Sequence, residues 1–163
     1  MTITQRQANL LGAVLCAGLM GYALYAQHVL GLQPCPLCIF QRVAVVGLGV
    51  VFLAAAIHGP GRGGARVYAL LIALAAAVGA AVSGRHLWLQ SLPPEKVPAC
   101  GPGLDYMLEA FPFTEVLQTV LSGSGECATV DWSLLGLAMP AWVLIAVLAL
   151  GLFGLWANLR RSA

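Results

Sequence analysis

The hydrophobic positions of the chain are gathered into four long runs, separated by more polar segments. Three of these runs carry no charge in their interior, and the second carries a single one, Arg42. A helix that crosses a bilayer needs about 20 consecutive and mostly apolar residues. The pattern therefore predicts four membrane-spanning helices, at approximately residues 9–30, 38–57, 66–85 and 134–157.

The composition of the chain agrees with this pattern. Of its 163 residues, 60% are hydrophobic and only 9% are charged, whereas soluble domains carry about 25% charged residues. This composition argues against a soluble domain. The runs are rich in Ala and Gly, which let helices approach closely in lipid. We expect an all-α integral membrane protein in which residues 1–163 form one four-helix transmembrane bundle.

The distribution of charge predicts how the chain is oriented in the membrane. All six acidic residues lie in the long segment 86–133. Basic residues lie before the first span, between the second and the third, and after the fourth, at Arg6, Arg62, Arg66, Arg160 and Arg161. Because basic loops stay in the cytoplasm, we expect both termini to be cytoplasmic. Segments 31–37 and 86–133 are then the two outer loops.

The first run has a second reading, as a cleaved signal peptide. Arg6 precedes the apolar stretch, and the small residues Ala23 and Ala26 lie near its end. The apolar core is longer than the 7–15 residues that are usual for a signal peptide. We therefore expect the first run to remain as a membrane span.

The five cysteines fall into two groups. Cys16 lies in the middle of the first span, where a cysteine commonly behaves as a small hydrophobic side chain. The other four map to the outer loops, where disulfides form and persist: Cys35, Cys38, Cys100 and Cys127. Sequence alone permits three ways to pair four cysteines. The adjacent Cys35 and Cys38 are the natural first pair, which leaves Cys100 with Cys127.

Three roles are open for Cys100 and Cys127. A disulfide between them could simply brace the loop. The flanking segments, ACGPG at 99–103 and SGSGEC at 122–127, are rich in Gly, Pro and Ser, and disulfides on exposed, pliable backbone are the exchangeable kind. A zinc site built from the four cysteines is a weaker alternative, because the single C-x-x-C motif has no second pair of the same spacing.

The motif CPLC at 35–38 stands where the second span begins. A helix N-terminus carries partial positive charge and favours the thiolate. The uncharged stretch 43–57 covers only about 22 Å at 1.5 Å per residue, less than the hydrocarbon core of about 30 Å. The helix must therefore begin near Cys38, and Arg42 lies one turn deeper on the same face. This arginine either reaches toward lipid headgroups or binds a polar group of a membrane-dissolved electron acceptor.

Two further features belong to the outer side. His86 ends the third expected span and is either a proton donor near the thiols or only a polar helix end, and His28 is equally ambiguous. Apolar residues between 113 and 121 recur at helical spacing, with Thr114 as the expected N-cap. They predict a short amphipathic helix that lies in the membrane interface or packs on the bundle.

These residues together resemble the disulfide bond formation protein B (DsbB) family of bacterial inner-membrane quinone reductases. The likeness rests on PCPLCIFQRVA at 34–44, on the two loop cysteines, and on WSLLGLAMPAW at 132–142. It covers nearly the whole chain, with four spans, a short first outer loop and a long second one. The resemblance implies a multi-pass protein of the bacterial inner membrane whose redox loops are periplasmic.

The resemblance also implies roles for matching cysteines. The protein partner would be a periplasmic DsbA-like thiol oxidase with a thioredoxin fold, whose active-site thiolate attacks Cys100 and leaves Cys127 as the loop mate. Electrons would then pass by disulfide exchange to the pair Cys35 and Cys38. Cys38 would react with the electron acceptor, ubiquinone or menaquinone, and Arg42 would stabilise a quinone oxygen.

The remaining expectations concern the surroundings of the quinone and the rival classes. His86 resembles the histidine that the family places near the quinone, and Gln41 stands where some relatives have an acidic residue. The resemblance implies no metal and no haem. A vitamin K epoxide reductase-like protein is a rival, although its C-x-x-C motif is expected at the last span. A structural four-span protein with loop-bracing disulfides is the other.

Overall fold

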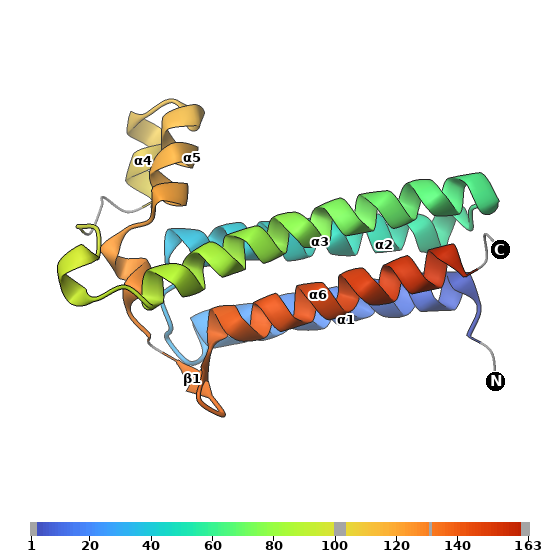
Figure 1. The fold of residues 1–163 in the computed structure, drawn as a ribbon, viewed down its shortest axis with the longest axis horizontal. Helices are drawn as coiled ribbons and strands as arrows, with labels where there is room; N and C mark the ends of the chain where they lie inside the picture. Colours follow the sequence, from blue (N-terminus) through green and yellow to red (C-terminus); the bar gives the residue numbers. More distant parts are fainter. Residues whose placement is uncertain (1–2, 100–103, 131, 161–163) are drawn as a thin grey trace.

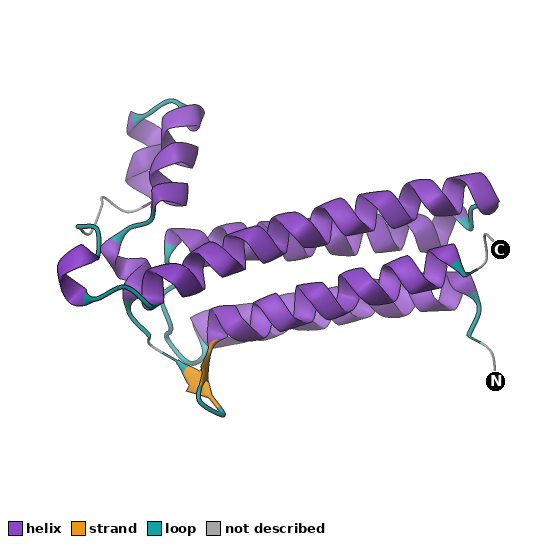
Figure 2. Ribbon diagram, in the orientation of Figure 1, coloured by secondary structure: helices purple, strands orange, loops and turns teal. Residues whose placement is uncertain are grey.

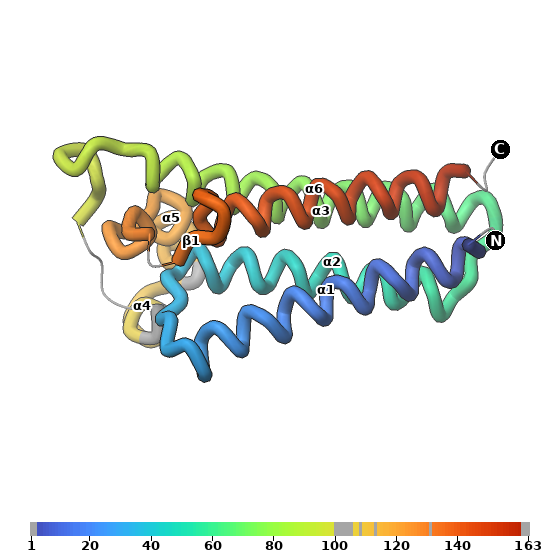
Figure 3. The backbone as a smooth tube through the Cα atoms, turned by 90° about the horizontal axis from the view of Figure 1, so that it is seen from below, coloured from blue at the N-terminus to red at the C-terminus, as the bar shows by residue number. Residues whose placement is uncertain are grey.

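Four long helices run side by side and form the body of the protein (Figure 1). In this computed structural model, which describes residues 3–99, 104–130 and 132–160, they are α1 (Gln5–His28), α2 (Pro36–His58), α3 (Arg62–Gln90) and α6 (Met139–Leu159). Each is long and apolar enough to cross a membrane. The two chain termini lie at one end of the bundle, and the short helices of the long loop lie at the other (Figures 1 and 3). We call the latter the cysteine end.

The predicted four-helix membrane bundle is confirmed, with differences at the helix boundaries. Helix α2 begins at Pro36, because proline is tolerated in the first turn, where its missing N–H would have no partner. Helix α3 continues to Gln90, so His86 lies inside this helix and not at its end. The expected start of the last helix at residue 134 was wrong, since α6 begins only at Met139.

The residues before α6 form a small β-hairpin instead. Strands β1 (Ser133–Leu134) and β2 (Leu137–Ala138) pair in antiparallel fashion, next to the first turn of α6 (Figure 2). Leu135 and Gly136 form the two-residue turn with φ values of 54° and 79°, and positive φ at both central positions is typical of a tight hairpin turn. The Trp142 indole N–H donates to the Leu134 carbonyl oxygen at 3.2 Å, which ties the hairpin to α6.

The interior of the bundle is built around the side chain of Phe52, which is fully buried. A Cβ atom at Gly12 would lie 2.7 Å from the Phe52 ring, and one at Gly154 would lie 2.8 Å from it. Glycine on α1 and α6 therefore makes room for the aromatic side chain of α2. Around the periphery the large apolar side chains are exposed, for example Val43 at 65% and Leu152 at 68%, as expected of a bundle that is surrounded by lipid.

The long loop folds into short helices at the cysteine end: 3₁₀ helix η1 (Pro94–Lys96), α4 (Leu104–Ala110), α5 (Phe113–Ser122) and 3₁₀ helix η2 (Gly125–Ala128). The predicted amphipathic helix at 113–121 corresponds to α5. Its N-cap is Pro112 and not Thr114, because the helix begins one residue before the threonine. Val116 and Val120 of α5 are buried, in a hydrophobic cluster with Leu37 and Leu89. In this structure the helix packs on the bundle.

Arg85 connects α5 to the bundle. Its guanidinium donates to the carbonyl oxygens of Leu121 and Ser122 at 2.9 and 2.8 Å. These carbonyls lie at the C-terminus of α5, where a cation is favourable. Gly123 follows with a φ of 91°, and a Cβ atom there would lie 2.4 Å from Leu89. Glycine therefore serves both the turn and the close approach to α3.

A buried polar network joins α1 to α6 at the opposite end of the bundle. The Gln5 amide donates to Asn158 Oδ1 at 2.9 Å, and the Asn9 amide donates to the same oxygen at 3.1 Å. Asn158 in turn donates to Asn9 Oδ1 at 3.0 Å and to the Gly154 carbonyl oxygen at 2.8 Å. All three side chains are at most 4% exposed. We call them the amide network.

Candidate functional site

The thiol pair of the C-x-x-C motif lies at the first turn of α2. Cys35 is the N-cap residue, in an extended conformation, and Cys38 follows within the helix. Their sulfur atoms are 3.2 Å apart, a thiol–thiol hydrogen bond. Both side chains are half-buried. The pair therefore lies at a helix N-terminus, where the backbone N–H groups of the first turn have no partner within the helix.

His86 and Gln41 form a buried polar chain that ends at Cys35. His86 Nε2 lies 3.8 Å from Cys35 Sγ, and His86 Nδ1 lies 3.3 Å from Gln41 Nε2. The imidazole is 2% exposed and the amide is 4% exposed. When the Gln41 amide donates to Nδ1, the imidazole N–H is on Nε2 and faces the sulfur. The orientation of the Gln41 amide thus sets whether Nε2 donates to the Cys35 sulfur or accepts from it.

Cys127 approaches the same thiol from the long loop. It lies in η2, is 1% exposed, and its sulfur, the Cys35 sulfur and a ring nitrogen of His86 all lie within 4.8 Å of one another. The Gly125 N–H donates to the carbonyl oxygen of Ala99 at 3.3 Å. Ala99 immediately precedes Cys100, which lies outside the described residues. Ala99 is thus hydrogen-bonded to a residue that lies two positions before Cys127.

The surroundings of Cys127 favour the protonated thiol. Its interaction with the Cys35 sulfur and its burial raise the pKa of the Cys127 thiol well above the ordinary value. Hydrogen bonds from the Leu37 backbone N–H and from Ser124 act in the opposite direction but are smaller. A thiolate at Cys127 is therefore disfavoured as long as the Cys35 sulfur lies beside it.

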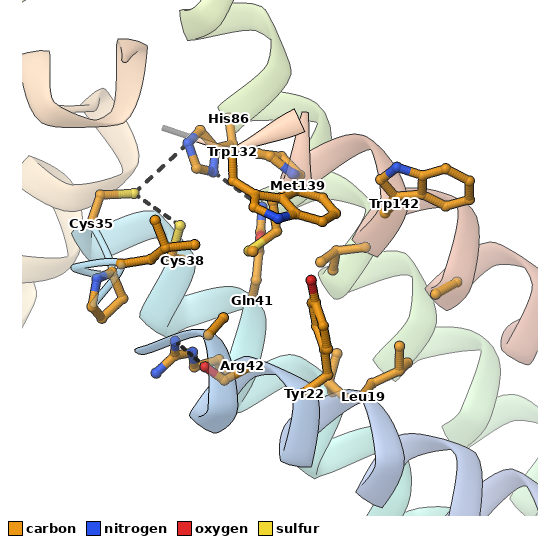
Figure 4. A pocket seen from close by; sticks show the side chains of 18 of the residues that line it. Leu19, Tyr22, Cys35, Cys38, Gln41, Arg42, His86, Trp132, Met139 and Trp142 are labelled. Atoms are coloured by element: carbon orange, nitrogen blue, oxygen red, sulfur yellow. Dashed lines mark hydrogen bonds between the residues drawn. The ribbon is translucent and has the colours of Figure 1, made fainter. Parts of the chain in front are cut away.

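Arg42 lies one helical turn beyond Cys38, as the span length predicted (Figure 4). Its guanidinium donates to Gln27 Oε1 and to the Ala23 carbonyl oxygen of α1, the latter at 3.1 Å. The arginine is half-buried and thus bridges α1 and α2 within the bundle. A guanidinium has five N–H donors, so these two contacts leave donors for a further acceptor.

A cavity of about 290 Å³ opens beside the thiols, Gln41 and Arg42. Figure 4 shows Tyr22, Trp132, Met139 and Trp142 around it. Its walls come from α1, α2, α3 and α6 and from the segment before β1, and they are mostly apolar. An apolar cavity with a few convergent polar groups suits a flat organic ring that has polar edges.

The sequence-predicted residues are brought together to different extents. Cys35, Cys38, Cys127, Arg42 and His86 lie in or beside one site, whereas His28 is exposed at the end of α1. Sequence reasoning gave no role to Gln41. It lies three residues after Cys38 and therefore on nearly the same helix face, and this spacing was the available signal. The aromatic residues Tyr22 and Trp132 were also missed as parts of the cavity wall.

Comparison with known proteins gives a consistent result. The sequence model of a family described as "Disulfide bond formation protein DsbB" matches residues 5–157. Disulfide bond formation protein B of Methylococcus capsulatus is 56% identical over 158 residues, which cover 96% of both chains. Those of Nitrosococcus oceani and Chromobacterium violaceum are 53% and 52% identical, over 96% and 99% of this chain and 92% and 97% of the relatives.

Proposed function

The chain belongs to the DsbB family and is a disulfide-forming oxidoreductase. We propose that it oxidises a periplasmic thiol oxidase of the DsbA type, which has a thioredoxin fold, and passes the electrons to a membrane quinone. The net reaction converts two partner thiols and one quinone into one disulfide and one quinol. The family membership excludes the structural four-span protein, and the position of the C-x-x-C motif at α2 disfavours the vitamin K epoxide reductase-like alternative.

One observation carries the proposal: the C-x-x-C thiols have a loop cysteine on one side and an apolar cavity on the other. Cys127 reaches Cys35 from the long loop, and Cys38 lines the cavity together with Arg42. A dithiol so placed can receive electrons by disulfide exchange and release them to an apolar acceptor.

The order of the exchange steps is based on the contact of Cys127 with Cys35 and on the role that the family resemblance implies for Cys100. A partner thiolate attacks a Cys100–Cys127 disulfide at Cys100, which forms a mixed disulfide and releases Cys127. Cys127 then attacks Cys35 in a Cys35–Cys38 disulfide, so that a Cys35–Cys127 bond forms and Cys38 leaves as a thiolate. The second partner thiol attacks the mixed disulfide and frees Cys100. Cys100 attacks Cys127, which restores the loop disulfide and releases Cys35.

The quinone accepts the two electrons and two protons that the partner dithiol gives up. Arg42 and the helix N-terminus stabilise negative charge near Cys38. His86 Nε2 faces Cys35. When Nδ1–H donates to the Gln41 amide oxygen, Nε2 is placed to take up the thiol proton, and an N–H on Nε2 is placed to return it. The aromatic side chains in the wall of the cavity offer flat faces on which a ring can stack.

The charges of the chain support the proposed orientation. Arg6 lies at the start of α1, Arg62 and Arg66 lie at the start of α3, and Arg160 follows α6. These helix ends lie at the end of the bundle that holds both termini (Figure 1), and Arg161 lies outside the described residues. The segments that contain Cys35 and Cys127 belong to the opposite end. With basic residues on the cytoplasmic side, the cysteine end faces the periplasm.

The test is a coupled assay with the purified full-length protein in detergent. A reduced thioredoxin-fold oxidase and a short-chain ubiquinone or menaquinone are added, and thiol loss and quinone absorbance are followed together. We expect one quinone to be reduced for each dithiol oxidised. Thiol oxidation without quinone reduction would refute the proposed acceptor. Cys16→Ala, which changes only a buried cysteine of the hydrophobic core, serves as the control and should keep full activity.

A further inference from the structure

Three potential metal ligands from three separate elements meet at the cysteine end. Cys35 caps α2, His86 lies in α3 and Cys127 lies in η2. We propose that the reduced protein binds a thiophilic divalent cation such as Zn²⁺ or Cd²⁺ at these three side chains, and that the bound metal blocks the enzyme. The site shares Cys35, Cys127 and His86 with the electron transfer proposed above, but metal binding itself requires no quinone.

The distances fit a small tetrahedral ion. The two sulfur atoms and a ring nitrogen of His86 lie within 4.8 Å of one another, and Cys35 Sγ lies 3.8 Å from His86 Nε2. Bond lengths of about 2.3 Å to sulfur and 2.0–2.1 Å to nitrogen separate neighbouring ligands of a tetrahedral zinc by roughly 3.5 Å. Side-chain adjustments of about 1 Å would therefore close the site. Three protein ligands leave the fourth position to water.

Gln41 provides the support that a metal-binding histidine needs. Metal-ligating histidines almost always bond through their other ring nitrogen to a neighbouring polar group, which fixes the ring. Here the Gln41 amide lies 3.3 Å from Nδ1, and both side chains are buried. Turning this amide by 180° presents its oxygen to Nδ1–H, and the lone pair of Nε2 then faces the two sulfurs.

The redox state decides whether the site exists. Binding displaces one proton from each thiol, so that one M²⁺ and two Cys–SH give one dithiolate complex and two H⁺, with no electrons transferred. A disulfide that includes Cys35 or Cys127 removes a ligand. The oxidised enzyme therefore does not bind the metal, whereas a metal bound to the reduced enzyme occupies the two sulfurs that exchange must use.

Cobalt(II) tests the site, because thiolate-bound Co²⁺ has a charge-transfer absorption that free Co²⁺ lacks. We expect the reduced full-length protein, free of quinone, to bind one Co²⁺ with this absorption and to release it to Zn²⁺. Cys127→Ser and His86→Ala should each weaken Co²⁺ binding by about 100-fold, and Gln41→Leu by about 10-fold. Cys16→Ala should bind as the unmodified chain does.

Three results would overturn the proposed metal site. One is a reduced protein without the thiolate–cobalt absorption, and another is an unchanged affinity in both Cys127→Ser and His86→Ala. The third is a loss of binding in Cys100→Ser but not in Cys127→Ser, which would move the site elsewhere. Thermal unfolding in detergent shows whether each variant is folded. If His86→Ala does not fold, the Co²⁺ affinity of Cys127→Ser decides whether the site exists.

Inhibition is measured with Zn²⁺ and the coupled assay. Reduced enzyme that is incubated with Zn²⁺ and then freed of excess metal should lose turnover and regain it with a chelator, whereas oxidised enzyme treated in the same way should keep it. If the reduced and the oxidised enzyme both keep their turnover after Zn²⁺ treatment, the proposed inhibition by metal is wrong. The two proposals fail separately. Normal quinone reduction without Co²⁺ binding refutes only the metal site, and Co²⁺ binding without quinone reduction refutes only the electron-transfer function.

Discussion

The bundle holds a buried polar cluster at each end, and the two clusters differ in how completely their groups are hydrogen-bonded. In the amide network, donors and acceptors of Gln5, Asn9 and Asn158 meet at 2.8–3.1 Å. At the cysteine end, Cys35, His86 and Gln41 are linked by contacts of 3.3 and 3.8 Å and adjoin a cavity.

This difference distinguishes polar groups that stabilise the fold from polar groups that can react. A saturated network within a bundle stabilises one arrangement of the helices and leaves no group free to react. A loosely bonded cluster of thiols and an imidazole contributes less to stability, but its groups can exchange partners. The amide network therefore serves to hold α1 against α6, and the cysteine end serves chemistry. The predictions below test this division.

The largest expected effect is at Cys38. Replacing it by Ser should lower quinone reduction by roughly a thousandfold or more, since a hydroxyl cannot replace the thiolate that carries the electrons. The unfolding temperature should stay close to that of the unmodified protein, because a serine hydroxyl can keep a hydrogen bond with Cys35, whose sulfur lies 3.2 Å from that of Cys38. The coupled assay and thermal unfolding in detergent check both parts. Appreciable turnover in this variant would refute the role of Cys38.

The opposite pattern is expected at Asn158. Asn158→Leu removes the partner of two buried amides, Gln5 and Asn9, and should lower the free energy of unfolding by about 1–2 kcal/mol. Quinone reduction per folded molecule should not change, because the network lies at the other end of the bundle. Denaturant titration in mixed micelles measures the stability. Leu152→Ala on the exposed face of α6 is a matched control and should have a smaller effect. If Asn158→Leu lost turnover while its stability stayed unchanged, the amide network would not be purely structural.

The sequence predicted the local features of the protein better than the contacts between distant parts of the chain. The four spans, the thiol pair at a helix start and Arg42 one turn deeper followed from hydrophobic run length and helix geometry, which are local properties. The contact of Cys127 with Cys35 depends on how the long loop folds back, and no periodicity encodes that. Residues 134–138 read as part of the last span because Leu and Ala suit a helix, but the positive φ of Leu135 and Gly136 turns the chain into a hairpin.

Arg42 connects structure and chemistry, since it bridges α1 and α2 and also lines the cavity. Arg42→Ala should raise the KM for quinone about tenfold, the equivalent of one charge-assisted hydrogen bond, and leave the KM for the protein partner unchanged. Arg42→Lys should recover part of the loss, because it keeps the charge but not the fork of donors. If only stability falls and the quinone dependence is unchanged, Arg42 is a helix bridge alone.

The smallest expected effect concerns the proton on Cys127. Because the neighbouring Cys35 and burial raise the pKa of Cys127, its thiolate fraction stays low near pH 8.5, where an ordinary thiol is about half ionised. Alkylation of Cys127 in the reduced, chelator-treated protein should therefore keep increasing with pH after ordinary thiols have reached their plateau, as site-resolved mass spectrometry of iodoacetamide labelling would show. Burial slows the reaction at every pH but does not set the midpoint of the profile.

In Cys35→Ala the largest cause of the raised pKa of Cys127 is gone, so the midpoint of the labelling profile should move to lower pH. An unchanged midpoint would mean that the two sulfurs are not neighbours in the reduced protein, and would remove the contact on which the exchange between the loop and the C-x-x-C pair depends.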